Sequence, residues 1–264
     1  LDGCDESSRG AGYRDHGVGS FATCGSVGAA SVWGWNATRS YTHCRFARRS
    51  PKEVKKALNK RNLVFIGDSM TRNMYYAQLR TMGIPEAGRY DATLPKHSDV
   101  FNTVGSASID FRWAPLAVDQ LTALRDINSK VAQGAGPDLI VMGGGTWDRL
   151  HVYATDEDQA SHRATVKDLA REMRMMRTVG SPVAWMVPTT INTPALNTED
   201  KRHHMKEEDM EIMRGVYAEA GVLSSASFVL DGPSFTADRV LESYDGVHYP
   251  PQVYDAGAQI LANA

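Results

Sequence analysis

Two short motifs near opposite ends of the chain carry the residue types that activate a serine hydroxyl. Residues 67–69 are Gly-Asp-Ser and follow an apolar run, so Ser69 stands where a buried strand is expected to pass into a helix. Residues 245–248 are Asp-Gly-Val-His and precede the last helical segment. A serine nucleophile needs an imidazole to take its proton and a carboxylate to orient that imidazole. Ser69, His248 and Asp245 therefore form a candidate catalytic triad.

Each motif also has an ordinary structural alternative. Serine often caps a helix N-terminus, and Ser69 could do only that. The Asp-x-x-His motif is also compatible with a surface turn, since the chain has 8 histidines. The order of the motifs favours the triad. Glycine permits a sharp turn before Ser69, and the helix after it directs backbone amides and a positive dipole end toward a developing oxyanion.

A third polar segment follows a second apolar run. Residues 143–148 are Gly-Gly-Gly-Thr-Trp-Asp. We interpret Gly145, Thr146 and Trp147 as a wall of the active site, with backbone amides near the oxyanion and the indole as a platform for a sugar ring. A flexible turn with a core tryptophan is the alternative.

Two polar side chains lie one helical turn beyond Ser69. Arg72 and Asn73 can donate hydrogen bonds to an oxyanion or to a substrate. The alternative is that both are solvated residues on the surface of the helix.

The elements that must position these motifs alternate between strand and helix. Apolar or alternating runs predict strands at 62–66, 108–113, 138–142, 182–187 and 228–230, and helices are expected at 51–59, 71–79, 158–177, 201–219 and 251–263. This order predicts an α/β fold with a parallel sheet covered on both faces, whose strand carboxyl ends carry the three motifs. We expect one domain over 1–264, with 1–50 as an irregular arm packed on the core.

Composition and charge disfavour several classes of protein. Of 264 residues, 42% are hydrophobic and 23% charged, which is ordinary for a soluble globular domain. The 29 basic and 31 acidic residues leave a net charge of −2, which disfavours a nucleic-acid binder. No run approaches the roughly 20 apolar residues of a membrane-spanning helix, and the first residues do not resemble a signal peptide. We expect a soluble fragment or a mature domain.

Three cysteines precede the first predicted strand of the sheet. Cys4, Cys24 and Cys44 lack the spacing of zinc ligands, so no metal site is expected. Their clustering favours one disulfide with a thiol left over, although three unrelated reduced cysteines are the alternative. Asn36 begins an Asn-Ala-Thr glycosylation sequon. These features together favour the secretory pathway.

The two triad motifs resemble those of a known family. Residues 65–73 and 245–250 are similar to the PC-esterase branch of the SGNH/GDSL hydrolases. Within that branch the resemblance is strongest to the lumenal domain of polysaccharide and sialic acid O-acetyltransferases, such as the fungal capsule acetylation protein and the plant reduced-wall-acetylation proteins. Trichome-birefringence-like acetyltransferases are more distant. Further counterparts occur in the expected order at 3–5, Cys44, 109–113 and 145–147.

The resemblance implies a fold, an activity and partners. It implies a three-layer α/β/α sandwich with a mostly parallel central sheet, the triad Ser69, Asp245 and His248, and a Cys4–Cys44 bridge. It implies transfer of an acetyl group through Ser69 to a hydroxyl of a polysaccharide or oligosaccharide. The donor would be acetyl-CoA or another acetyl carrier, with no bound cofactor. The expected location is the Golgi lumen, with a membrane region of the full-length protein or a membrane partner supplying acetyl groups.

One departure from the wider superfamily concerns the oxyanion hole. Ordinary SGNH hydrolases carry an oxyanion-binding Asn where this chain has Trp147. The oxyanion would then be bound by the Ser69 amide, by a glycine such as Gly105, or by the Arg72 and Asn73 side chains.

The same motifs are compatible with two other functions. With water as the acceptor, the triad would make a glycan acetyl-esterase. A glycan-binding domain that kept the fold without catalysis is the alternative from another class, which the intact Ser, Asp and His set disfavours.

Overall fold

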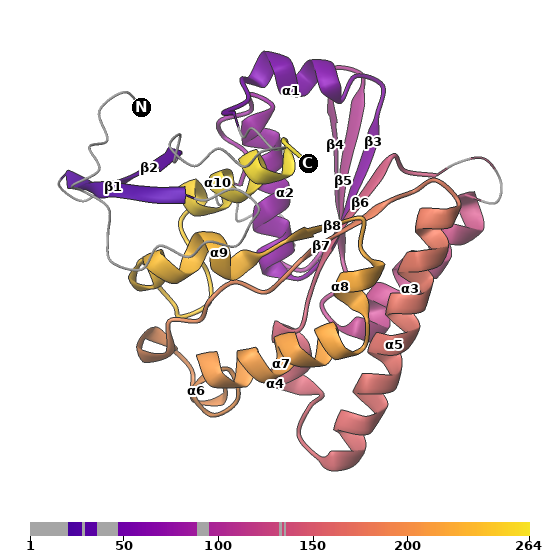
Figure 1. Cartoon of the computed structure of the whole chain (residues 1–264), viewed down its shortest axis with the longest axis vertical. Coiled ribbons are helices and arrows are strands. Elements are labelled where there is room, and N and C mark those ends of the chain that lie inside the picture. The colour runs from indigo at the N-terminus through magenta and orange to yellow at the C-terminus, as the bar shows by residue number, and fades with distance from the viewer. Residues whose placement is uncertain (1–20, 28–29, 36–46, 89–94, 132–133, 135) are drawn as a thin grey trace.

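The structure is a computed structural model that describes residues 21–27, 30–35, 47–88, 95–131, 134 and 136–264. For 21–27 and 30–35 it describes the backbone only. The described core is an α/β sandwich around a six-stranded sheet (Figure 1).

The sheet has five parallel strands and one antiparallel edge strand. Its order is β4-β5-β3-β6-β7-β8, and only β4 runs against its neighbour. The strands are β3 (Asn62–Gly67), β4 (Val100–Val104), β5 (Ala107–Trp113), β6 (Leu139–Gly143), β7 (Val183–Met186) and β8 (Phe228–Leu230). The central strands are buried along nearly their whole length, as expected for a sheet that helices cover on both faces.

Helices form a layer on each face of this sheet. On one face α2 (Ser69–Thr81) packs against α10 (Pro251–Leu261), and on the other α3 (Ala117–Val131) packs against α5 (Asp156–Thr178) (Figure 1). The remaining helical elements are α1 (Pro51–Ala57), α4 (Thr146–His151), α6 (Glu199–His204), α7 (Glu207–Glu219), α8 (Val222–Ser225), α9 (Gly232–Thr236), η2 (Thr193–Ala195) and η3 (Ala237–Glu242). The predicted three-layer, mostly parallel α/β fold is confirmed.

Local signals account for several element boundaries. Ser50 and Glu53 form a reciprocal capping box that begins α1, with Pro51 at its first position. Thr155 and Asp158 do the same for α5. No helix among the described residues combines the length and apolar character that crossing a bilayer requires.

The prediction of one long helix over 201–219 is wrong. The chain leaves the helical conformation at Met205 and Lys206, so that α6 and α7 are separate. Met205 is buried at the break. The turn also lets the Glu207 carboxylate accept a hydrogen bond from the Ile191 amide at 2.6 Å, so a tertiary contact interrupts the helical pattern.

The expected arm at 1–50 is not wholly irregular. Strands β1 (Phe21–Val27) and β2 (Ala30–Trp35) form an antiparallel hairpin. The other predictions for this segment, the Cys4–Cys44 bridge and the glycan on Asn36, concern residues outside the described part of the chain, as does most of the proposed packing of the arm. Strand β4 and helices α3 and α4 were not predicted.

Candidate active site

Ser69 is the first residue of α2, at the carboxyl end of β3. The residue that caps this helix is Asp68, whose Oδ1 accepts from the amides of Met70 at 2.9 Å and Thr71 at 3.4 Å. The alternative role of Ser69 as a cap is therefore wrong, and its hydroxyl is free for another partner. Burial raises the pKa of Asp68, although hydrogen bonds from Thr146 and from the two amides oppose that rise.

The turn before Ser69 depends on close contact between two glycines. A Cβ on Gly67 would lie 2.3 Å from the carbonyl oxygen of Gly143 and 2.4 Å from Oγ1 of Thr71. Thr71 donates a hydrogen bond of 3.1 Å to that same carbonyl. The start of α2 thus rests directly on the ends of β3 and β6, which places Ser69 at the edge of the sheet.

Asp245 and His248 lie on the loop between η3 and α10. Asp245 Oδ1 accepts from the amides of Val247 at 2.9 Å and His248 at 2.7 Å, which closes a compact turn. Its Oδ2 lies 2.8 Å from Nδ1 of His248. Burial acts to raise the pKa of Asp245, but the hydrogen bonds from the imidazole and the two amides outweigh it and hold the pKa well below its usual range.

The three candidate residues meet in one hydrogen-bonded chain. Ser69 Oγ lies 2.7 Å from Nε2 of His248, although 179 positions separate them in sequence. With Nδ1–H donating to Asp245, the hydrogen-bond network assigns Nε2 as the acceptor of the serine proton. This arrangement can generate a serine nucleophile by general-base catalysis.

Known proteins resemble this chain in sequence. No protein-family model matches the chain. It is 27% identical over 255 residues to Protein ALTERED XYLOGLUCAN 9 of Arabidopsis thaliana, covering 88% of this chain and 68% of that protein. It is 22% identical over 232 residues to N-acetylneuraminate (7)9-O-acetyltransferase of Danio rerio, covering 84% of this chain but only 28% of that protein.

A solved structure shares the fold. A peptidoglycan O-acetylesterase superposes with a TM-score of 0.50 at 12% identity, covering 81% of this chain and 94% of that chain. The chain is thus similar in sequence to a xyloglucan-related protein and to a sialic acid O-acetyltransferase, and it shares its fold with an O-acetylesterase. This finding confirms the resemblance drawn from the two triad motifs.

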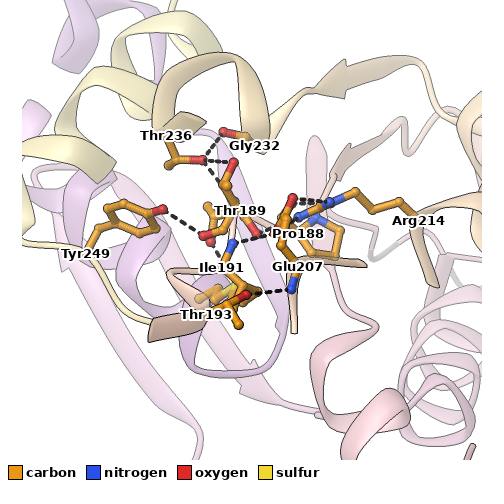
Figure 2. A network of polar contacts seen from close by, with 11 residues as sticks. Pro188, Thr189, Ile191, Thr193, Glu207, Arg214, Gly232, Thr236 and Tyr249 are labelled. Atoms are coloured by element: carbon orange, nitrogen blue, oxygen red, sulfur yellow. Dashed lines mark hydrogen bonds and ion pairs between the residues drawn. The ribbon is translucent and has the colours of Figure 1, made fainter. Parts of the chain in front are cut away.

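A connecting segment after β7 holds Tyr249, the residue that follows His248 (Figure 2). The Tyr249 hydroxyl donates to the Thr190 carbonyl at 2.7 Å, and the Thr190 amide donates to Oγ1 of Thr236 at 3.0 Å. The Asn192 amide donates to the Gly246 carbonyl at 2.9 Å. We call residues 187–196 the strap.

An ion pair on α7 fixes the strap from its other side (Figure 2). The Arg214 guanidinium donates to the carbonyls of Pro188 at 3.0 Å and Thr189 at 2.9 Å, and it pairs with both oxygens of Glu207 at 2.7 and 3.2 Å. Glu207 in turn accepts from the Ile191 amide. Sequence reasoning missed these residues, because their spacing carries no local motif.

Two further side chains contact the triad and were also missed. Lys201 Nζ lies 3.6 Å from Asp245 Oδ2, the oxygen that faces the imidazole. The Tyr244 ring stacks beside His248 with centroids 6.4 Å apart and planes at 23°. The Lys201 side chain is only 20% exposed.

Trp147 belongs to a cluster of aromatic rings at the carboxyl ends of the strands. The cluster also contains Trp113, His97 and His151, with neighbouring centroids 4.4 to 5.5 Å apart. The rest of this predicted wall faces inward. Thr146 donates to the Asp68 carboxylate, and Gly145 is the N-cap residue of α4, with φ of 117°.

The predicted oxyanion donors have different positions. Gly105 is wrong as a candidate. It lies in the turn from β4 to β5, at the amino end of β5, whereas Ser69 follows the carboxyl end of β3. The 7-residue strand β5 separates the two ends by about 20 Å. Arg72 donates to the Lys96 carbonyl and lies over Trp113, and Asn73 lies beside Tyr254. The Ser69 amide is in the first turn of α2, where helix amides have no intrahelical partner.

Within the described residues, no three His, Cys, Asp or Glu side chains gather as a metal site requires.

Proposed function

We propose that this chain is an O-acetyltransferase that carries an acetyl group on Ser69 to a hydroxyl of a polysaccharide or other glycan. The observation that carries the proposal is the hydrogen-bonded chain from Ser69 through His248 to Asp245. The names of the two sequence relatives, one a xyloglucan-related protein and one a sialic acid O-acetyltransferase, support an acetyl group and a glycan acceptor.

The reaction would proceed as a double displacement. Nε2 of His248 takes the Ser69 proton as the serine oxygen attacks the carbonyl carbon of an acetyl donor, such as acetyl-CoA or another acetyl carrier. The leaving group departs with that proton and an acetyl-enzyme remains. A sugar hydroxyl then gives its proton to His248 and attacks the acetyl carbonyl, which regenerates Ser69. The start of α2 supplies amides and a positive dipole end near the oxyanion.

The second candidate is a glycan acetyl-esterase with the same triad. The His248 side chain is 23% exposed, so water can reach the imidazole that would activate it. The two functions differ only in the acceptor that resolves the acetyl-enzyme.

Mass spectrometry of the intact protein tests the proposal. Exposure to an acetyl donor should add one acetyl group at Ser69, and Ser69→Ala should remain unmodified. Released acetate and acetylated oligosaccharide, measured in the same sample, separate the esterase from the transferase. If Ser69→Ala retained all glycan-dependent function, a non-catalytic glycan-binding domain would be the better explanation.

The location and partners are part of the same proposal. We propose that the chain works in the secretory pathway, in the Golgi lumen, because the Asn36 sequon fits that pathway and the names of both relatives refer to sugars. A membrane region of the full-length protein, or a membrane partner, would supply the acetyl groups. Detection of a glycan on Asn36 in protein secreted from a eukaryotic host is the direct measurement.

A further inference from the structure

The aromatic cluster lies beside Ser69 because of the strand register. Trp113 is the last residue of β5 and is paired with Gly67 of β3, two residues before Ser69. Gly67 is also paired with Gly143 of β6, and Trp147 follows in the first turn of α4. Neighbouring strands are about 4.8 Å apart, so Trp113 and Trp147 belong to the two strand ends that flank the end of β3, from which the chain continues to Ser69.

Four rings form this cluster. His97 stacks on Trp113 with centroids 4.4 Å apart and planes at 13°. Trp147 meets Trp113 edge-on at 5.5 Å and meets His97 edge-on at 5.5 Å. His151 lies 5.0 Å from Trp147. The rings therefore make one continuous aromatic surface rather than separate contacts.

The cluster is left partly open to solvent, unlike the tryptophan of the core. Trp185 is 0% exposed and stacks on Tyr217. Trp113 and Trp147 are only half-buried, and His97 and His151 are exposed. Burying such large rings would stabilise the fold, so their exposure beside a nucleophile indicates a surface that a ligand covers.

The cluster is also held in place before any ligand arrives. Arg72 donates to the Lys96 carbonyl and lies 5.5 Å from the centre of the Trp113 ring. The Trp113 amide donates to Asp99 Oδ1 at 2.8 Å. These contacts fasten the segment that carries His97 to the helix that begins with Ser69, which lowers the entropic cost of binding.

We propose that His97, Trp113, Trp147 and His151 form the acceptor subsite and bind a pyranose ring of the glycan. The C–H face of a pyranose carries partial positive charge and suits the negative faces of aromatic rings, while polar groups at the rim fit its hydroxyls. Arg72 and the two imidazoles supply those polar groups. Occupancy directs a sugar hydroxyl at His248 and displaces water, which favours transfer over hydrolysis.

The inference rests on the proposed function, and Trp147→Ala separates the two. Acetylation of Ser69 by the donor should stay within about threefold of the unmodified protein. The KM for an oligosaccharide acceptor should rise about tenfold or more, with a matching fall in the ratio of transfer to hydrolysis. Trp147→Phe should raise this KM less than Trp147→Ala does, because phenylalanine keeps an aromatic ring. Phe101→Ala, which removes a 63% exposed ring from β4, is the control and should change neither value.

A binding measurement keeps the test independent of turnover. Ser69→Ala should bind at least one of xylohexaose, a xyloglucan oligosaccharide and sialyllactose, as measured by calorimetry, and the Ser69→Ala/Trp147→Ala double variant should bind it about tenfold more weakly. The subsite is overturned if none of the three oligosaccharides binds, or if the double variant binds as tightly as Ser69→Ala. It is also overturned if folded Trp147→Ala loses equal factors in the rate of Ser69 acetylation and in the rate of transfer to the acceptor. Failure of the unmodified protein to form an acetyl-enzyme would count against the proposed function instead.

Discussion

The two sides of the triad are positioned in different ways. Ser69 stands at a junction of regular elements, where β3 passes into α2 and Asp68 caps the helix. Asp245 and His248 stand on a loop that depends on hydrogen bonds to the strap and on the Glu207–Arg214 pair behind it. The nucleophile is thus placed by local backbone structure, whereas the base is placed by side chains from distant parts of the chain. Substitutions on the two sides should separate activity from stability differently.

The largest loss of activity is expected where both sides contribute to one step. Ser69→Ala and His248→Ala should each lower acetyl transfer on the order of 10⁴- to 10⁶-fold, because neither half of the proton transfer works alone. Initial rates with donor and oligosaccharide measure this. A loss of less than about tenfold in either variant would contradict the proposed triad.

Asp245→Asn should lower activity on the order of 10⁴-fold, since it removes the carboxylate that orients His248. The pKa of Asp245 lies well below its usual range in the fold, so the ionised group stabilises the native state above the unfolded value near 3.9. That contribution is lost as the pH falls through the folded pKa. Urea unfolding should therefore show Asp245→Asn less stable at pH 7, with the gap closing below about pH 4.

Gly246→Ala tests how closely the loop that carries Asp245 and His248 packs against Leu196. Gly246 has φ of 87°, and an added Cβ would lie 2.8 Å from the Leu196 amide nitrogen. We expect about a hundredfold loss of activity from displacement of the loop, with about 2 kcal/mol lower stability. Gly105→Ala is the matched control: its φ is 66° and its Cβ meets no atom within 4 Å, so activity should be unchanged.

Arg214→Lys tests the support behind the strap. The planar Arg214 guanidinium donates at once to the Pro188 carbonyl, the Thr189 carbonyl and the Glu207 carboxylate, and a lysine ammonium cannot reproduce this geometry. We expect kcat to fall about tenfold and stability to fall by about 1–3 kcal/mol, with KM little changed. Arg171→Lys, which alters a pair with Asp168 on the surface, is the control and should be nearly neutral. Equal kcat in both variants would show that the strap does not position His248.

The smallest effect is expected from Lys201→Met. The ammonium lies 3.6 Å from the Asp245 oxygen that His248 also contacts. Loss of that positive charge removes an ion pair that helps to hold the carboxylate in place, so kcat should fall a few-fold while KM is little changed. Initial rates with donor and oligosaccharide measure this. Lys201→Arg should keep most of the rate, and a Lys201→Met variant as fast as the unmodified protein would exclude this role.

Much of the fold was predictable because it depends on local patterns. The apolar runs that become β3, β6 and β7 are buried on both faces, and caps such as Ser50 and Thr155 begin helices where the sequence indicates. Errors arose where a tertiary contact overrode a local preference. The helical pattern over 201–219 breaks at Met205 because burial of that side chain and the contacts of Glu207 stabilise the turn.

The sequence by itself determined which residues could form the triad, since Gly-Asp-Ser after a buried strand and Asp-x-x-His before the last helix are short-range signals. Only the tertiary structure decided that Gly105 lies at the far edge of the sheet, because the antiparallel β4 reverses the chain there. It also decided that Arg214, Thr190 and Lys201 support the base, and that Trp113 and Trp147 meet. Such contacts join residues that no local pattern links, so they exist only once the sheet has fixed which strand ends are neighbours.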